Sequence, residues 1–141
     1  MSVNYQGEKE NLRYRVKDYI DIDMDFGRNP FTKDIMMKKG DASIKQSVKN
    51  LVLSRIGERT FQPNIGTEVY NMLFENIMPQ TSISLQSTIE NVINTYEPRV
   101  VLDTVECVPD HDNHGYAVSI IFTLINDPQP ITVEFFLEWL R

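Results

Sequence analysis

The spacing of hydrophobic residues changes once in this sequence, close to Pro98, and this change constrains the fold more than any other feature. Before Pro98, apolar residues recur every three to four positions, which is typical of helices with one buried face. After Pro98, three segments rich in β-branched and aromatic residues are predicted to be strands. Helices followed by a run of strands indicate an α+β fold.

The first predicted helix has the clearest apolar face. It begins at Asp41, a candidate cap, and ends at Gly57, because glycine readily adopts the left-handed conformation that closes a helix. Its predicted buried face consists of Ile44, Val48, Leu51, Val52 and Ile56.

Two further helices are predicted before Pro98. A short one covers about residues 67–75, and residues 78–80 (Met-Pro-Gln) are expected to break it. The next begins near Ser82 or Ser84 and must end before Pro98, because proline disfavours helical geometry in the residue that precedes it.

The strands are predicted at residues 100–108, 116–125 and 131–140, with turns at 110–115 and 126–130. Three consecutive strands with such short links predict a three-stranded antiparallel meander. Residues 19–27 alternate apolar and acidic side chains, which indicates an extended segment with one face packed. The predicted organisation is therefore an extended N-terminal arm, residues 1–40, followed by a single α+β domain, residues 41–141.

The charge of the chain bears on its partners. Its 141 residues carry 14 Lys and Arg against 20 Asp and Glu, and a net charge of -6 argues against nucleic-acid binding. Residues 1–96 hold 12 basic and 12 acidic residues, whereas residues 97–141 hold 2 and 8. The acidic strands are thus predicted to meet a basic partner, in an association that weakens with salt. No apolar run reaches the length of about 20 residues that crosses a bilayer, so no membrane contact is expected.

Three groups of residues resemble metal or thiol sites only weakly. Asp21, Asp23 and Asp25 match the start of a calcium loop, but Phe26 and Thr32 occupy positions that require glycine and glutamate, so a solvated strand face is predicted. His111 and His114, in a polar turn, are predicted to be exposed. Cys107, the single cysteine, is predicted to be buried and inert. No metal or cofactor is therefore expected.

Paired carboxylates leave an enzymatic alternative open. Glu58, Glu75 and Glu97 flank apolar segments, and a glycosidase needs two carboxyl groups about 5–10 Å apart, one of them with a raised pKa. The sequence does not indicate that any two of them converge, so no catalytic residue is assigned.

Two other features suit an interaction protein. Glu97, Pro98 and Arg99 lie where helix gives way to sheet, and they form either a helix stop with a surface ion pair or a rigid recognition corner. The last strand is a candidate sheet edge with Val133, Phe135, Leu137 and Trp139 along one face. Such an edge is either protected by charges, here Glu134 and Glu138, or accepts a strand from another chain.

Several of these segments, in this order, resemble one family. They are Asp21-Ile22-Asp23, residues 42–48, residues 57–66, Leu73-Phe74-Glu75 and Glu97-Pro98-Arg99. From about Tyr19 onward the chain resembles the baseplate wedge and sheath-initiator family of contractile phage tails, sometimes described as lysozyme-like, with relatives in type VI secretion baseplates.

The resemblance implies a structural role in the virion. Six copies would sit in the tail baseplate after synthesis in the host cytoplasm, linking other wedge proteins to the first ring of sheath subunits, with contacts to tube or hub proteins. It implies that Glu97, Pro98 and Arg99 contact the wedge and that the terminal strand pairs with sheath. On this basis Arg99→Ala would leave the domain folded but prevent its incorporation. The alternative is a small muramidase acting on peptidoglycan.

Overall fold

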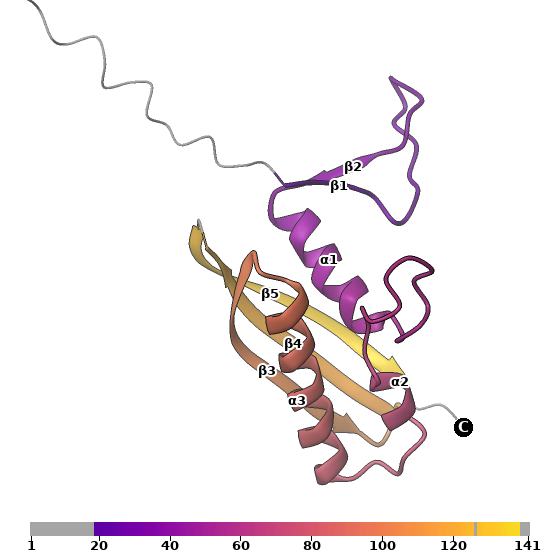
Figure 1. Ribbon diagram of the computed structural model, residues 1–141, viewed down its shortest axis with the longest axis vertical. Helices are drawn as coiled ribbons and strands as arrows, with labels where there is room; N and C mark the ends of the chain where they lie inside the picture. Colours follow the sequence, from indigo (N-terminus) through magenta and orange to yellow (C-terminus); the bar gives the residue numbers. More distant parts are fainter. Residues whose placement is uncertain (1–18, 126, 139–141) are drawn as a thin grey trace, which may run out of the picture.

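A computed structural model gives the fold and describes residues 19–125 and 127–138 (Figure 1). Three helices precede a three-stranded antiparallel sheet, so the α+β class is confirmed. The elements in chain order are β1 (Ile20–Ile22), β2 (Met37–Lys39), α1 (Asp41–Leu53), α2 (Val69–Met72), α3 (Pro79–Tyr96), β3 (Val100–Asp110), β4 (Gly115–Leu124) and β5 (Asp127–Glu138). No helix in the described part of the chain is long and apolar enough to span a membrane.

The core lies between α3 and one face of the sheet β3-β4-β5 (Figure 1). Alternate residues point into it along β4 and along residues 131–138 of β5, as the period of two predicts, whereas a register shift between Leu102 and Thr104 interrupts the alternation in β3. α1 contacts both α3 and β5, and α2 packs on α3. The central strand contributes Tyr116, Val118, Ile120 and Phe122, and the two long helices contribute Ile44, Val48, Val52, Leu85, Ile89 and Ile93.

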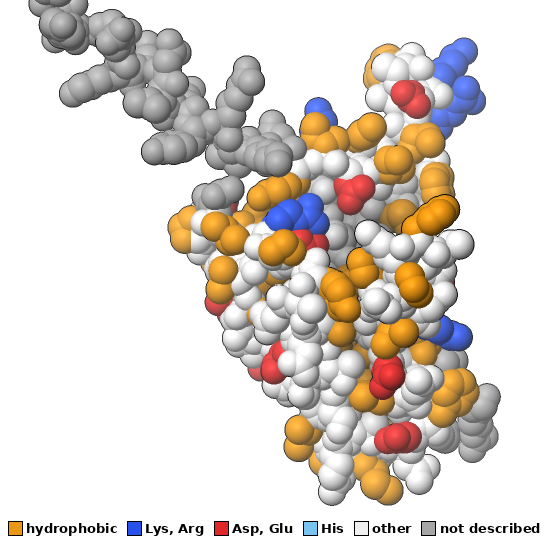
Figure 2. All heavy atoms as spheres, viewed as in Figure 1, with side chains coloured by type: hydrophobic (Ala, Val, Ile, Leu, Met, Phe, Trp, Pro, Cys, Tyr) orange, Lys and Arg blue, Asp and Glu red, His pale blue; other side chains and the backbone are white. Residues whose placement is uncertain are grey.

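Only Ile20–Ile22 of the predicted extended segment 19–27 forms a strand, β1, because the chain turns at Met24 and Asp25, and the apolar face is not packed as predicted. Ile20 and Ile22 are 54% and 47% exposed, because β1 pairs with β2 in a hairpin that projects beyond the core (Figure 1). Hydrophobic side chains consequently gather on the surface at this end of the molecule (Figure 2). Strand β2, which reads Met-Lys-Lys, has no alternating pattern and was not predicted.

Both ends of α1 differ from the prediction. Gly40 is the cap residue, with φ of 59°, and Asp41 is the first helical residue. The helix ends at Leu53, because Ser54 is extended and Arg55 then forms an isolated parallel bridge with Thr67. Ile56 is therefore exposed instead of belonging to the buried face.

The other corrections also arise from proline and glycine. Gly57 has positive φ in the loop after α1 instead of closing that helix. Pro79 was predicted to break a helix but occupies the first turn of α3, where its missing N–H needs no partner. β5 begins at Asp127, which pairs with Leu124, so most of the predicted 126–130 turn is strand. Prolines are tolerated there because β5 lies at the sheet edge.

Candidate interaction site

The junction between α3 and β3 holds Glu97, Pro98 and Arg99. Glu97 follows the last residue of α3, and its N–H still donates a hydrogen bond of 2.9 Å to the carbonyl of Ile93. Its backbone has already left the helical region, with φ of -121° and ψ of 77°, because a following proline disfavours helical geometry. The predicted end of α3 before Pro98 is confirmed, and Arg99 is the last residue before β3.

The side chains of Glu97 and Arg99 form a bidentate ion pair. Nε and Nη2 of Arg99 donate to Oε1 and Oε2 of Glu97 at 2.5 Å and 2.6 Å. Ser47 of α1 completes the cluster, because its Oγ donates to Oε2 of Glu97 at 2.8 Å and accepts from Nη2 of Arg99 at 3.0 Å. The cluster therefore ties α1 to the junction between α3 and the sheet.

Burial distinguishes this cluster from a surface ion pair. Glu97 is only 4% exposed, whereas the Arg99 side chain keeps 32% of its surface. Among the described residues, Nη1 of Arg99 has no hydrogen-bond acceptor, and the guanidinium lies over the ring of Tyr19 at 5.2 Å. Most of the planar fork is thus used within the chain, and a partner could reach only Nη1 and the outer edge of the guanidinium.

The cluster also sets the protonation of Glu97. Burial by itself would raise the pKa of this carboxyl, but hydrogen bonds from Arg99 and Ser47 and the positive charge of Arg99 outweigh it and lower the pKa below its ordinary value. Glu97 therefore carries a negative charge at neutral pH. A general acid of a glycosidase needs the opposite shift.

Acidification is expected to destabilise the fold through Glu97. A lowered folded-state pKa contributes stability that is complete above the unfolded pKa, near 4.5, and is lost as the pH falls through the folded value. Urea unfolding measured between pH 7 and pH 3 should show this loss beginning near pH 5. In Glu97→Gln the slope should be smaller by at most about 1.4 kcal/mol per pH unit, the value for one proton. Equal slopes in the two proteins would contradict the assignment.

Sequence reasoning missed Ser47 and Tyr19 as parts of this cluster. Ser47 lies 50 positions from Glu97 and occupies an ordinary polar position of α1. No local pattern indicates such a contact, because the helix packing that creates it joins distant segments. The pairing of Glu97 with Arg99, two residues apart, was accessible from the sequence.

The predicted edge-strand residues face inward. Val133 and Leu137 are 7% and 3% exposed and belong to the core, and Phe135 is partly buried against it. Trp139 lies outside the described residues. A strand added to β5 would therefore meet its backbone, together with the outward-facing side chains of the same strand, which are Thr132, Glu134, Phe136 and Glu138.

Both outer strands of the sheet are unpaired on one side among the described residues. β3 contains a register shift between Leu102 and Thr104 and carries Pro109, which lacks a donor. β5 pairs with β4 in unbroken register over residues 131–138, a run without proline. The edge of β5 is thus the longer regular one.

Two of the three aspartates that resemble the start of a calcium loop are engaged by a lysine. Lys38 forms ion pairs with Asp23 at 2.9 Å and with Asp25 at 3.6 Å. The hydrogen bond from Lys38 lowers the pKa of Asp23, so this carboxylate already has a cationic partner. No group of three or more metal-ligating side chains occurs in the described ranges 19–125 and 127–138.

The histidine and cysteine predictions are confirmed. His111 and His114 are exposed in the turn between β3 and β4. Cys107 is buried in β3, and burial, with a smaller effect of Glu90, raises the pKa of its thiol to about 11. This thiol is therefore uncharged and unreactive at neutral pH.

Comparisons with known proteins agree with the resemblance. Residues 38–129 match the model of the family described as baseplate wedge protein gp25. The chain is 34% identical over 115 residues to the baseplate wedge protein gp25 of Enterobacteria phage T4, covering 82% of this chain and 86% of that protein.

Solved structures share the fold. A Geobacter sulfurreducens protein provisionally named a tail lysozyme aligns with a TM-score of 0.65 and 17% identity, covering 70% of this chain and 89% of its own. A chain of the anti-feeding prophage baseplate aligns with a TM-score of 0.60 and 18% identity over 88% of both chains. A chain of the type VI secretion baseplate aligns with a TM-score of 0.51 and 17% identity, covering 68% of this chain and 92% of its own.

At these identities the solved structures establish the fold alone, including for the protein named a lysozyme. The family model and the T4 relative carry the assignment, since together they cover most of this chain. The chain belongs to the baseplate wedge protein gp25 family and is a structural component of a phage baseplate wedge.

Proposed function

We propose that this protein joins the baseplate wedge to the first ring of sheath subunits and starts sheath assembly by accepting a sheath strand at the free edge of β5. The observation that carries the proposal is the eight-residue run 131–138, which pairs with β4 in regular register and has no described strand on its outer side. Addition of a strand requires such an edge, and its backbone hydrogen bonds tolerate many guest sequences.

The wedge contact is proposed at Glu97, Pro98 and Arg99. Pro98 is exposed, and Arg99 retains Nη1 and about a third of its side-chain surface. The backbone of Arg99 also accepts a hydrogen bond from the N–H of Ile125, next to the start of β5. The wedge contact would thus lie at one end of the sheet, leaving residues 131–138 accessible to the sheath.

The remaining features of the proposal concern the assembled particle. Six copies would be present in each baseplate, with tube or hub proteins as further neighbours, and the chain would be made in the host cytoplasm before assembly. The role is structural instead of enzymatic. The ion pair between Glu97 and Arg99 supports this, because it lowers the pKa of the most buried of the three candidate glutamates.

Assembly with and without the protein tests the proposal. Baseplates of the same tail assembled in its absence are expected to bind no sheath, and adding the purified full chain should restore sheath on most particles. Electron microscopy and sedimentation measure the fraction of sheathed particles. Equal sheath formation on baseplates that lack the protein would contradict a role in starting sheath assembly.

A further inference from the structure

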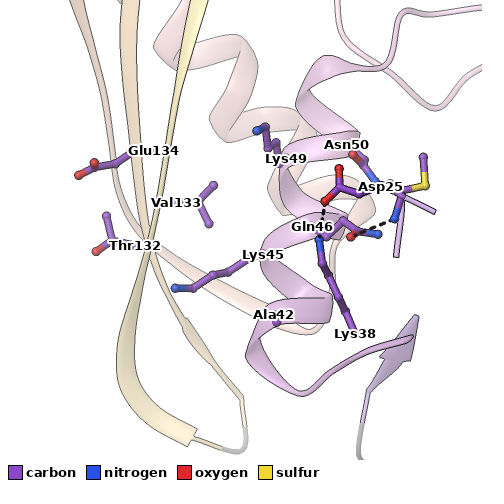
Figure 3. Close-up of a pocket in the computed structure, with 11 residues that line it drawn as sticks. Asp25, Lys38, Ala42, Lys45, Gln46, Lys49, Asn50, Thr132, Val133 and Glu134 are labelled. Carbon is purple, nitrogen blue, oxygen red and sulfur yellow. Dashed lines mark hydrogen bonds and ion pairs between the residues drawn. The ribbon is translucent and has the colours of Figure 1, made fainter. Parts of the chain in front are cut away.

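A groove of about 450 Å³ separates the edge of β5 from α1 and the β1–β2 hairpin (Figure 3). One wall is the Thr132–Val133–Glu134 stretch of β5, and the other consists mainly of α1 side chains. Gln46 holds the hairpin against α1, because its side chain donates to the carbonyl of Ile22 at 2.7 Å and accepts from the N–H of Met24 at 3.4 Å. The groove therefore has a structured wall facing the free strand edge.

Three lysines line this groove, and two of them have no acidic partner within residues 19–125 and 127–138. Lys38 is engaged by Asp23 and Asp25. Lys45 and Lys49 are exposed, and no described carboxylate forms an ion pair with either of them. They lie four residues apart on one helix face, a spacing at which like charges repel. An acidic group between α1 and β5 would relieve this repulsion.

The two lysines are aimed at the strand edge. Figure 3 shows Lys45 and Lys49 extending from α1 toward β5, while Val133 points toward α1 and Thr132 and Glu134 point away. Four residues of helix advance about 6 Å along the axis, and alternate residues of a strand lie about 6.6 Å apart. A strand added beside β5 would therefore place two of its side chains, at positions i and i+2, opposite Lys45 and Lys49.

We infer that the strand accepted by β5 is acidic, with Asp or Glu at two alternate positions on the face that meets α1. This inference rests on the proposed strand addition and specifies the chemistry of the guest. It differs from the expectation of a basic partner, which came from the net charge of residues 97–141. Of the two acidic residues at the groove, Asp25 is paired with Lys38 and Glu134 points away from α1, so Lys45 and Lys49 set the charge on the side that faces the strand edge.

Synthetic strand peptides test the inference with the full chain labelled with ¹⁵N. Three ten-residue peptides of alternating Thr and Val would carry two Glu, two Gln or two Lys at positions i and i+2. Titrations followed by NMR should show shifts in β5, with the Glu peptide binding about fivefold more tightly than the Gln peptide, as expected for two exposed ion pairs. This preference should shrink at 0.5 M salt.

Charge reversal provides the matched control. Lys45→Glu/Lys49→Glu should bind the Lys peptide more tightly than the Glu peptide. Lys33→Glu/Arg59→Glu, with the same change in net charge outside the groove, should keep the original preference. The affected side chains are exposed, so circular dichroism is expected to show folded proteins.

The outcomes separate this inference from the proposed function. Equal binding of the Glu and Gln peptides at β5 would overturn the acidic guest and support strand addition. Absence of any peptide-induced shift in β5 would overturn both. Shifts in β5 caused by concentrating the chain alone would indicate that a second copy fills the groove, and would also overturn the acidic guest.

Discussion

Arg99→Ala is expected to lower the free energy of unfolding by about 3 kcal/mol at pH 7. The substitution leaves Glu97, which is 4% exposed, with Ser47 as its one remaining side-chain donor among the described residues. Removing one member of a buried pair costs about 3–5 kcal/mol. Glu97 can limit this cost by taking a proton, and at pH 7 this requires about 3.4 kcal/mol for a carboxyl of ordinary pKa. The variant is still expected to fold, since a domain is typically stable by about 5–15 kcal/mol, but with a smaller free energy of unfolding.

The pH dependence of Arg99→Ala should have the opposite sign to that of the unmodified chain. Without the guanidinium, burial dominates and raises the pKa of Glu97, so the folded state binds the proton more tightly than the unfolded state. Stability then rises as the pH falls from 7 toward the unfolded pKa near 4.5. Urea unfolding at pH 7 and pH 5 measures this, and a loss below 1 kcal/mol at pH 7 would indicate a surface ion pair instead.

A neutral pair separates the structural role of Arg99 from its proposed wedge contact. In Glu97→Gln/Arg99→Met the two charges are absent, and replacing a buried ion pair in this way is often neutral or stabilising. This variant should recover most of the stability lost in Arg99→Ala. If the double variant is stable but, like Arg99→Ala, fails to enter the baseplate, the result supports a direct contact of Arg99 with the wedge. If it assembles normally, the contact is wrong and Arg99 acts only by holding α1 to the sheet.

Proline at an outward-facing amide of β5 is expected to weaken sheath binding about 100-fold while wedge binding persists. Proline removes one backbone donor, and its ring obstructs the neighbouring strand. Together the lost hydrogen bond and the steric clash are expected to cost about 3 kcal/mol of binding free energy, which corresponds to a loss of about 100-fold in affinity. The affinities of the folded chain for sheath subunits and for wedge proteins would be measured separately. Unchanged sheath binding would contradict strand addition at β5.

Hydrogen exchange identifies which residue of β5 should be replaced by proline and which neighbouring residue serves as the control. Alternate amides of residues 131–138 face β4 and are protected in the free chain, whereas the others face outward and should gain protection only when sheath is bound. Either Thr132 or Val133 has its amide facing outward, and hydrogen exchange shows which. Replacing that residue with proline tests sheath binding. Proline at the other breaks the ladder with β4 and should lower stability. Urea unfolding of both variants verifies this difference.

Much of the fold could be predicted because its determinants are local. The change of period near Pro98 separates helices from strands, and proline at position 98 ends α3 through contacts with its immediate neighbour. Two of the errors occurred where one residue type suits two positions. Pro79 begins a helix as readily as it interrupts one, and Gly57 adopts its positive φ in a loop instead of at a helix end.

The site was predictable only in part. Glu97 and Arg99 can pair because they are two positions apart, with only the rigid Pro98 between them, and this spacing is visible in the sequence. Their burial and their contact with Ser47 depend on the packing of α1 against the sheet. The apolar face of β1 shows the same limit, since the alternation is local but the surface that would cover it is absent from the described part of this chain.

The sequence alone determined the α+β class, the boundary at Pro98 and a net charge of -6, because each depends on residue types and near neighbours. The tertiary structure decided which strands are edges and which charges lie beside them. Lys45 and Lys49 belong to the electrically neutral first part of the sequence, yet packing of α1 next to β5 places them at the free edge of an acidic sheet. Charges at a protein surface interact strongly only over a few ångströms. The side chains that lie beside this edge in space therefore determine what it can bind, and the net charge of the chain does not.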